Sequence, residues 1–264
     1  MDMTRLKNKK LWFILMVVLM LLIAALGAKT AWYAVQDLTF YWTERTETEK
    51  KVKAFAEENG LFFSQYPESL INLLERNPET EDFVLQYPLW DKEEADLSGF
   101  DRKNGVPLFL QWDPQWGYEQ YGSDYLAITG CGPTCLAMAG YYLTGSTNMN
   151  PGEIAAFAEE NEYYASGYGS SWTLISEGSG RLGLKATELP LVKKKLTDAL
   201  EAGNPVILAM GAGDFTTTGH FIVLTGVENG FFRVNDPNSR VNSQKLWSYE
   251  QLEDQIRNIW EISL

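Results

Sequence analysis

Histidine and cysteine are scarce in this chain, whose 264 residues include one histidine, His220, and two cysteines, Cys131 and Cys135. Two cysteines cannot hold together a disulfide-rich scaffold, although four residues apart on a helix they could approach bridging distance. One histidine and two cysteines a turn apart also make a poor zinc-ligand set. The sequence has no GxxxxGK[ST] loop for a nucleotide. We therefore expect no metal and no cofactor.

Positive charge is also in short supply, with 22 Lys and Arg against 35 Asp and Glu, giving a formal net charge of -13 and a sequence pI near 4.6. Such a surface repels phosphate backbones, which argues against nucleic-acid binding. The acidity is typical of a solvated surface and does not identify a substrate. The apolar content of 45% is ample for a sizeable core. The length suits one medium domain, or a smaller domain with appendages.

A strongly apolar, uncharged run lies near the N-terminus, from Leu11 to Ala28. Eighteen residues at about 1.5 Å each span about 27 Å, nearly the thickness of a hydrocarbon core. Four cations precede it, namely Arg5, Lys7, Lys9 and Lys10. Because such a cluster stays cytoplasmic, we expect a cytoplasmic tail at 1–10 and a transmembrane signal anchor at 11–28. The remainder of the chain, in a single-pass protein of the cell membrane, then lies outside.

A cleaved signal peptide is the alternative for this segment, with Ala25-Leu26-Gly27 as a passable cleavage site, and the protein is then secreted. Residues 29–104 are expected to form an extracytoplasmic stalk and helical region. Its charged part reads as an exposed helix that stops at Gly60, and Pro67 and Pro78 each open a short helix. Whether residues 40–100 act as stalk, scaffold or regulator stays open.

Residues 105–264 are expected to form one folded domain. The pattern predicts a strand at VPLFLQW, helices at 133–143, 151–160 and 191–202, strands at PVILAM, HFIVLTGV and FFRVND, and a final helix near 249–259. The last two strands are joined across Glu228-Asn229-Gly230, which is a hairpin signal. An early group of helices followed by strands favours an α+β fold over alternating βαβ units.

Cys131 stands just before Gly132-Pro133, where a helix should begin. A helix N-terminus carries partial positive charge and favours the thiolate, which is the nucleophilic form of cysteine. Gly132 offers room for a substrate, and the helix that follows is apolar all round, which predicts a central and rigid support. The alternative is that Cys131 is a small buried hydrophobic residue. Cys135 is expected to be a packed core thiol.

His220 begins a predicted strand, after a loop of small residues. A general base at such an edge can reach both a thiol and a substrate. Because it is the only histidine, any mechanism that depends on histidine must use it. The hairpin brings Asp236 near His220, where a carboxylate can orient the imidazole and stabilise its protonated form. Asn235 and Asn238 are nearby substitutes, and an Asp-Pro turn is the alternative interpretation of Asp236.

Thiol acyl transfer also needs a hydrogen-bond donor for the developing oxyanion, such as a Gln amide together with the backbone N–H of Cys131. Gln111 and Gln115, in FLQWDPQWG, both qualify from the residues alone. The loop YYASGYGSSWT combines glycines and aromatics, so Tyr168, Gly169 and Trp172 are candidates for lining the substrate cleft, although Trp172 also fits a core position beside a turn. Gly130 and Gly219 are two further candidates for substrate binding, because they adjoin Cys131 and His220.

Four stretches, VPLFLQWDPQWGYEQYG, GCGPTCLAM, GDFTTTGHFIVLTG and VNDPNS, resemble as a set the bacterial cysteine peptidases related to the bacteriocin-processing (double-glycine leader) family of the papain-like group. The segment YPESLINLLERNPETEDFVLQYP resembles the region upstream of the peptidase in exported members. The resemblance implies a papain-like fold, with a central helix carrying Cys131 packed on an antiparallel sheet carrying His220 and Asp236. It also implies that Gln111, which directly follows VPLFL, is the oxyanion donor.

One departure limits what the resemblance implies. Well-studied processing peptidases sit on transporters and face the cytoplasm, whereas this chain is expected to have one membrane segment and to face outward. Leader-peptide processing is therefore not carried over. The expected activity is an extracytoplasmic cysteine peptidase that hydrolyses peptide or protein substrates. The alternatives are a cell-wall amide hydrolase with the same thiol chemistry and an anchored binding module without turnover.

Overall fold

The computed structural model describes residues 17–18, 21, 24, 27–37, 45–92, 94–167 and 169–264. The chain divides into two compact units, residues 1–75 and 76–264. Within the described ranges, no helix has the length and apolar character needed to cross a bilayer. Most of the predicted anchor at 11–28 lies outside those ranges, so the anchor remains a prediction.

The first unit contains a helical stretch at 27–37, α2 (Glu47–Glu58), the 3-10 turn η2 (Phe63–Gln65) and α3 (Glu68–Arg76). Thr46 begins α2 with a capping box, in which its hydroxyl accepts from the Glu49 N–H while the Glu49 carboxylate accepts from the Thr46 N–H. The predicted apolar stripe of α3 is buried, namely Leu70, Ile71, Leu73 and Leu74. The helix opened by Pro67 was thus predicted from its start signal and apolar stripe. The helix expected to stop at Gly60 is present as α2, but it is not exposed throughout, because Val52, Lys53 and Ala56 are buried.

The second unit begins with short helical turns. These are η3 (Pro78–Thr80), α4 (Glu81–Gln86), η4 (Tyr87–Leu89) and η5 (Arg102–Asn104). Phe83 stacks on Tyr118 with ring centroids 4.1 Å apart, and the Tyr118 hydroxyl donates to the Phe83 carbonyl over 2.6 Å. The segment after residue 76 therefore packs against the residues that follow it in the same unit.

A helical layer comes next, built from α5 (Leu126–Thr129), α6 (Cys131–Thr144), α7 (Pro151–Glu160), the π-helical turn η6 (Leu174–Gly178) and α8 (Ser179–Arg181). Two short strand pairs accompany it, β1 (Gln120–Tyr121) with β2 (Asp124–Tyr125) and β3 (Tyr164–Ala165) with β4 (Gly169–Ser170). The predicted helices at 133–143 and 151–160 correspond to α6 and α7.

The sheet has six strands in the order β5-β10-β6-β7-β8-β9, and every neighbouring pair is antiparallel. Its strands are β5 (Lys185–Glu188), β6 (Val206–Met210), β7 (His220–Glu228), β8 (Phe231–Asn235), β9 (Leu246–Trp247) and β10 (Ile256–Ser263). The remaining helices are α9 (Lys193–Glu201), α10 (Arg240–Ser243), α11 (Tyr249–Leu252) and the 3-10 turn η7 (Glu253–Gln255).

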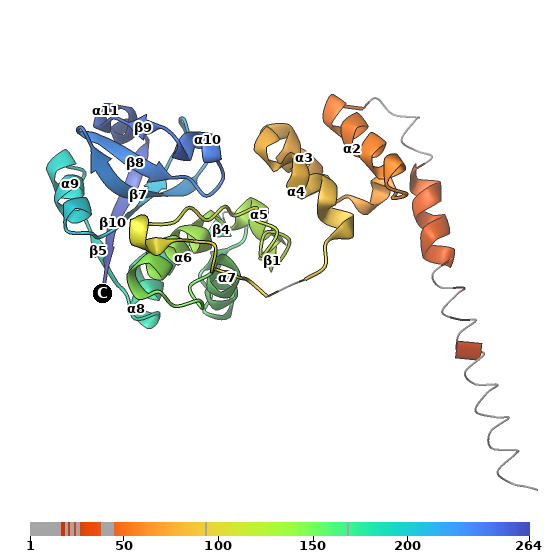
Figure 1. The fold of residues 1–264 in the computed structure, drawn as a ribbon, viewed down its shortest axis with the longest axis horizontal. Helices are drawn as coiled ribbons and strands as arrows, with labels where there is room; N and C mark the ends of the chain where they lie inside the picture. The colour runs from red at the N-terminus through yellow and green to blue at the C-terminus, as the bar shows by residue number, and fades with distance from the viewer. Residues whose placement is uncertain are drawn as a thin grey trace, which may run out of the picture. The chain divides into compact units, whose positions relative to one another are not determined.

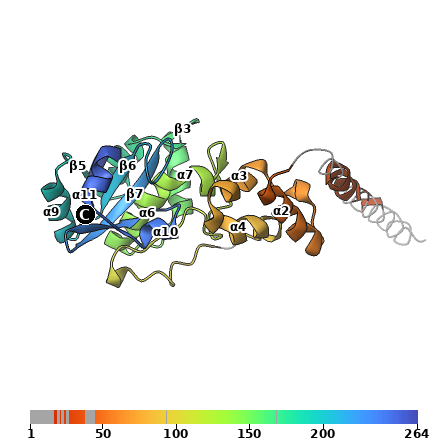
Figure 2. The same ribbon diagram turned by 90° about the horizontal axis from the view of Figure 1, so that it is seen from above.

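Alternating residues of the sheet enter two different cores. Phe221 and Val223 of β7 belong to the core that includes α6, whereas Ile222 and Leu224 belong to the core that includes α9. This is the period of two expected of a strand buried on both faces. The α6 and α9 helices therefore cover opposite faces of the sheet (Figure 1), and Figure 2 shows α6 beside β7. The predicted α+β fold, with the cysteine-bearing helix packed on an antiparallel sheet, is confirmed.

The predicted strand at VPLFLQW is wrong, because the described backbone at 106–112 pairs with no strand. Other groups satisfy its polar atoms. The Asn235 side chain donates to the carbonyls of Val106 and Pro107 over 3.0 and 3.1 Å, and the Gln111 N–H donates to the Pro237 carbonyl over 2.8 Å. Pro107 itself has no N–H to offer a ladder.

The predicted final helix near 249–259 is wrong in its second half. Residues 249–255 form α11 and η7, but Ile256 begins β10, which lies between β5 and β6. The register of β10 shifts between Ile256 and Asn258. This bulge buries Ile256, Ile259 and Trp260, whose spacing of three and four residues imitates a helical stripe.

Candidate active site

Cys131 is the first residue of α6, and Gly130 is its N-cap. Its side chain is half-buried and is a free thiol. As the first helical residue it has no acceptor for its N–H within α6. The helix is buried from Gly132 to Tyr141, so the thiol stands at the exposed end of a rigid element, as the sequence predicted.

His220 is the first residue of β7, is paired with Met210 of β6, and is 9% exposed. Its Nε2 atom lies 2.8 Å from Oδ1 of Asp236, and the side chain of Cys131 is close enough to contribute to the raised pKa of the ring. Because Nε2 is taken by Asp236, Nδ1 is the nitrogen that remains for the thiol. The structure thus brings together the predicted nucleophile, base and orienting carboxylate.

The electrostatics of His220 favour its protonated form. Burial lowers the pKa of this imidazole, but the charge and hydrogen bond of Asp236, together with Cys131, outweigh burial and raise the pKa to about 10. At neutral pH the ring therefore carries a proton that can be given to a leaving amine. Burial also raises the pKa of Cys135 well above its ordinary value, so this fully buried thiol stays protonated, as expected of a core residue.

Asp236 follows β8 directly and is 1% exposed. Besides His220, its carboxylate accepts from the Asn238 N–H to Oδ1 and from the Asn242 side chain to Oδ2, both over 2.9 Å. Asn235 instead ties its side chain to residues 106 and 107. Of the three candidates for the orienting position, Asp236 is therefore the one that contacts the imidazole.

The two glutamines have different surroundings. Gln111 is 3% exposed, and its Nε2 donates to the carbonyl of Ala127 over 2.7 Å, four residues before Cys131. That amide nitrogen carries a second hydrogen, whereas the buried Oε1 has no hydrogen-bond partner among the residues that the structure describes. Gln115 accepts from the Asp96 N–H with its Oε1 over 2.6 Å. The surroundings of Gln111 suit an oxyanion donor better than those of Gln115.

The predicted substrate-binding residues differ from one another in burial and in the groups that surround them. Gly219 adjoins His220, and a Cβ atom at this position would have no neighbouring atom within 4 Å among the described residues. Trp172 is 47% exposed, and its ring lies 5.8 Å from that of Trp260. Gly169 takes a φ of +78°, which favours glycine. Gly130 is buried, and its N–H donates to the Leu126 carbonyl over 2.8 Å. Tyr168 lies outside the described residues.

Gly132 does not serve the role that the sequence suggested. A Cβ atom on this buried residue stands 2.6 Å from both Cβ and Oγ of Ser170 in β4. The missing side chain therefore makes room for β4 and not for a substrate. Ser170 in turn hydrogen bonds with the buried Tyr121 hydroxyl over 2.8 Å, and both burial and the charge of Cys131 raise the pKa of that phenol. This Tyr-Ser pair beside the cysteine was missed, because nothing local in the sequence joins positions 121 and 170.

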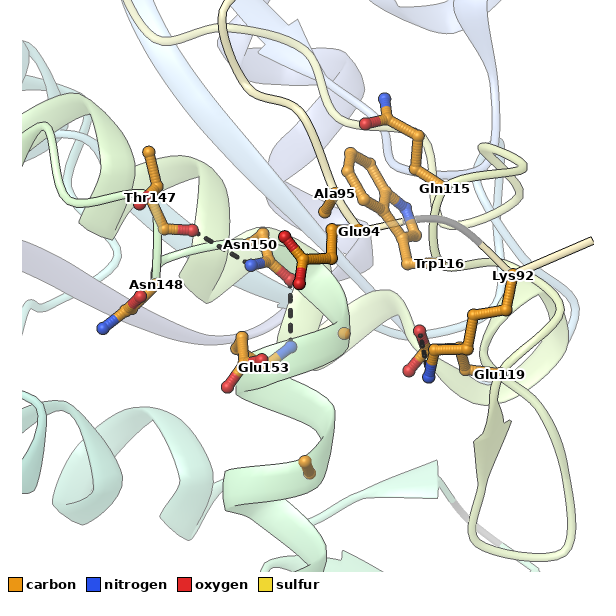
Figure 3. Close-up of a pocket in the computed structure, with 12 residues that line it drawn as sticks. Lys92, Glu94, Ala95, Gln115, Trp116, Glu119, Thr147, Asn148, Asn150 and Glu153 are labelled. Carbon is orange, nitrogen blue, oxygen red and sulfur yellow. Dashed lines mark hydrogen bonds and ion pairs between the residues drawn. The ribbon is translucent and has the colours of Figure 1, made fainter.

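A cavity of about 550 Å3 lies elsewhere in the second unit, and its lining contains no cysteine or histidine (Figure 3). Its polar groups already bond to each other. Asn150 accepts from the Glu153 N–H and donates to the Thr147 carbonyl, and Lys92 pairs with Glu119 over 3.1 Å. The hollow therefore contains neither a thiol nor an imidazole, and the predicted nucleophile and base both lie outside its lining.

Comparisons with known proteins identify a family and several similar solved structures. A family model described as Peptidase_C39 like family matches residues 103–263. A search of the curated proteins gave no match. Among solved structures, the peptidase domain of Streptococcus ComA, described as a bifunctional ABC transporter of a quorum-sensing pathway, is 20% identical, covering 51% of this chain and 89% of that chain with a TM-score of 0.39.

Two further solved structures are similar at the same level. A double-glycine-motif protease from an AMS/PCAT transporter, solved with its leader peptide, is 20% identical, with 60% of this chain and 89% of that chain covered and a TM-score of 0.37. A C39-like peptidase from Bacillus anthracis is 18% identical, with 59% and 94% covered and a TM-score of 0.36. The family match spans the four sequence stretches that carry the predicted catalytic residues.

Proposed function

This chain belongs to the C39-like peptidase family and is a cysteine-type peptidase, and we propose that it is membrane-anchored, extracytoplasmic and built around Cys131 as nucleophile. His220 is then the acid and base, Asp236 its orienting partner and Gln111 the oxyanion donor. The observation that carries these assignments is that one buried imidazole lies 2.8 Å from Asp236 and is close enough to Cys131 for that side chain to raise its pKa. The chain has no other histidine to take that role.

The first half of the mechanism forms an acyl-enzyme. The Cys131 thiolate attacks the scissile carbonyl carbon, and the electron pair of the carbonyl moves onto oxygen. The second amide hydrogen of Gln111 and the backbone N–H of Cys131 stabilise that oxyanion. When the intermediate collapses, the C–N bond breaks and the His220 imidazolium gives its proton to the leaving amine, which leaves a thioester on Cys131.

The second half releases the acid product. His220, now neutral, takes a proton from water as that water attacks the thioester. The oxyanion forms again at the same donors and then collapses, which breaks the C–S bond and returns the Cys131 thiolate beside a protonated His220. Asp236 keeps the ring oriented throughout, because its carboxylate is itself held by Asn238 and Asn242.

The location proposed for the enzyme is supported by the N-terminal sequence. An uncharged run at 11–28 follows four cations within the first ten residues, and such a cluster favours the cytoplasmic side of a membrane. The net charge of -13 gives no reason to expect nucleic acid as a partner. The substrate proposed is accordingly a peptide or protein that is reached outside the cytoplasm.

Peptide profiling with the full chain tests the activity. The wild type is incubated with an unstructured peptide library and, separately, with peptidoglycan fragments, beside Cys131→Ala and Cys135→Ala. We expect peptide cleavage that is lost in Cys131→Ala and kept in Cys135→Ala, since Cys135 is a buried core residue. Cleavage confined to peptidoglycan amides indicates the cell-wall alternative, and equal cleavage by Cys131→Ala rules out this nucleophile.

A separate experiment tests on which side of the membrane Cys131 lies. A membrane-impermeant maleimide applied to intact expressing cells should label Cys131, because its thiol is half-buried whereas Cys135 is fully buried. Cys131→Ala is the control for background labelling. Labelling that requires lysis of the cells contradicts the extracytoplasmic location without bearing on the chemistry.

A further inference from the structure

We propose that Asn77 and Glu79, which precede the family-matched region at 103–263, are positioning residues of the active site. They hold the segment 236–241, here called the Asp236 loop, which carries the orienting carboxylate. The inference rests on the proposed function of Asp236 and Gln111. It extends the catalytic machinery into a segment that the family model does not cover.

Five hydrogen bonds join Asn77 and Glu79 to the loop, and one of them runs from the Asn77 side chain to Oδ1 of Asn238 over 3.3 Å. The Glu79 carboxylate accepts from the Ser239 hydroxyl over 2.6 Å, from the Arg240 N–H over 2.8 Å and from the Val241 N–H over 3.4 Å. The Asn77 side chain donates to the Asn238 carbonyl over 2.7 Å. One carboxylate and one amide thus bind four consecutive residues of the loop. Hydrogen bonds to a charged group are among the stronger ones in proteins.

Hydrogen bonds within the loop connect these contacts to the carboxylate of Asp236. The Ser239 hydroxyl, which donates to Glu79, also accepts from the Asn242 N–H over 3.1 Å. The Asn242 side chain donates to Oδ2 of Asp236, and the Asn238 N–H donates to Oδ1. A continuous chain of hydrogen bonds therefore leads from Glu79 through Ser239 and Asn242 to Asp236, and from there to His220.

The opposite side of the loop is bound to the proposed oxyanion donor. The Gln111 N–H donates to the Pro237 carbonyl over 2.8 Å, and the Trp112 indole donates over 3.0 Å to the Asn238 carbonyl that also accepts from Asn77. The Arg240 guanidinium lies 4.3 Å from the centre of the Trp112 ring. The Asp236 loop is thus clamped between residues 77–79 and 111–112, so that its position sets both Asp236 and Gln111.

Local folding explains why residues 77–79 suit this role. Asn77 caps the turn η3, with its Oδ1 accepting from the Glu79 N–H over 3.1 Å, and Pro78 fixes the first residue of that turn. The hydroxyl of the fully buried Thr80 donates to the Asn77 carbonyl over 2.8 Å. The turn is therefore rigid by itself. A misplacement of about 1 Å in a catalytic group can cost about 10²-fold in rate, so a clamp of this kind acts on turnover.

The test compares Glu79→Ala and Glu79→Gln with Asp82→Asn, which removes a negative charge from an exposed position three residues on. Three quantities are measured on the full chain, namely kcat and KM for a cleaved peptide, the alkaline limb of the pH profile, and the pH profile of Cys131 alkylation by iodoacetamide. Far-UV circular dichroism on heating reports folding. Glutamine keeps the shape of Glu79 but has one acceptor oxygen in place of two.

We expect Glu79→Ala to lower kcat by about 10- to 10²-fold with KM within about twofold, and Glu79→Gln to lower it less. The alkaline limb should move to lower pH, because a loosened Asp236 holds the His220 proton less firmly. Alkylation of Cys131 at neutral pH should become slower, because less imidazolium remains beside the thiol. Asp82→Asn should match the wild type. If Glu79→Ala fails to fold, Glu79→Gln carries the test.

Unchanged kcat and pH profiles in folded Glu79 variants overturn the inference, as does an equal loss in Asp82→Asn, which indicates a general effect of charge. Failure of the proposed function looks different. In that case His220→Ala leaves the rate of Cys131 alkylation unchanged. If the rate of Cys131 alkylation depends on His220 but is unchanged in the Glu79 variants, this inference is contradicted while the proposed function stands.

Discussion

The Nε2 atom of His220 lies 2.8 Å from Oδ1 of Asp236, although 16 positions separate the two residues in the chain. The β7–β8 hairpin produces this approach, since its register pairs Val223 with Asn235 and so brings the start of β7 to the end of β8. The contact also sets the charge of the site, because Asp236 holds a proton on a buried imidazole. Four measurable consequences follow from this site.

Stability should fall as the pH is raised above neutrality. The pKa of His220 is about 10 in the folded protein, against 6.5 for an ordinary histidine. The folded state therefore binds one more proton between these values, and the stabilisation is fully present below pH 6.5 and lost as the pH rises through about 10. The free energy of unfolding should decrease across this window by up to about 1.4 kcal/mol per pH unit.

Urea unfolding at pH 6, 8 and 10 checks this prediction, with Asp236→Asn as the comparison. The variant lacks the charge that raises the pKa of His220, so its free energy of unfolding should depend less steeply on pH. Lysines and tyrosines titrate in both proteins, and the difference between the two curves isolates the pair. Parallel curves contradict the assignment of the shift to Asp236.

Gln111→Ala should lower kcat by about 10²- to 10³-fold, the usual loss on removing one oxyanion donor. Gln115→Ala should stay within about twofold of the wild type, because Gln115 bonds to the Asp96 backbone. Alkylation of Cys131 by iodoacetamide forms no oxyanion, so Gln111→Ala should keep its alkylation rate. A parallel loss of turnover and alkylation indicates a disrupted site and not a missing donor.

Trp172→Ala should raise KM for peptide substrates with little change in the melting temperature. The side chain is 47% exposed, so its removal leaves no enclosed cavity. Trp172→Phe keeps an aromatic surface and should restore most of the affinity. The idea that Trp172 lines the cleft fails if the alanine variant unfolds, or if it stays folded with an unchanged KM.

Gly132→Ala should destabilise the protein by about 1–3 kcal/mol, because the added methyl group overlaps Ser170 in a packed region. Ser170→Gly removes the overlapping atoms and should recover part of that loss in the double variant. Urea midpoints of the two single variants and the double variant measure the coupling. Additive effects of the two substitutions argue against the close approach of α6 and β4.

The sequence predicted the elements whose signals are local. Asn229 and Gly230 take φ values of +50° and +82°, as a tight hairpin turn requires at both positions, and this turn alone directs His220 towards Asp236. The sequence pattern did not predict β10, because the bulge near Ile256 gives its buried residues the spacing of a helical stripe. Nor could it choose between Gln111 and Gln115, whose surroundings differ only through the path of the chain around Ala127 and Asp96.

The order of residues along the chain thus determined which groups we propose for the chemistry, because one thiol at a helix start and a single imidazole at a strand start leave few other combinations. Tertiary structure alone decided what holds those groups in place. The hydrogen bonds of Glu79 to Ser239 and of Asn77 to Asn238 span 160 and 161 positions, and no periodicity or turn signal encodes contacts at such separations. They arise only when packing of the whole unit brings an early turn against a late loop.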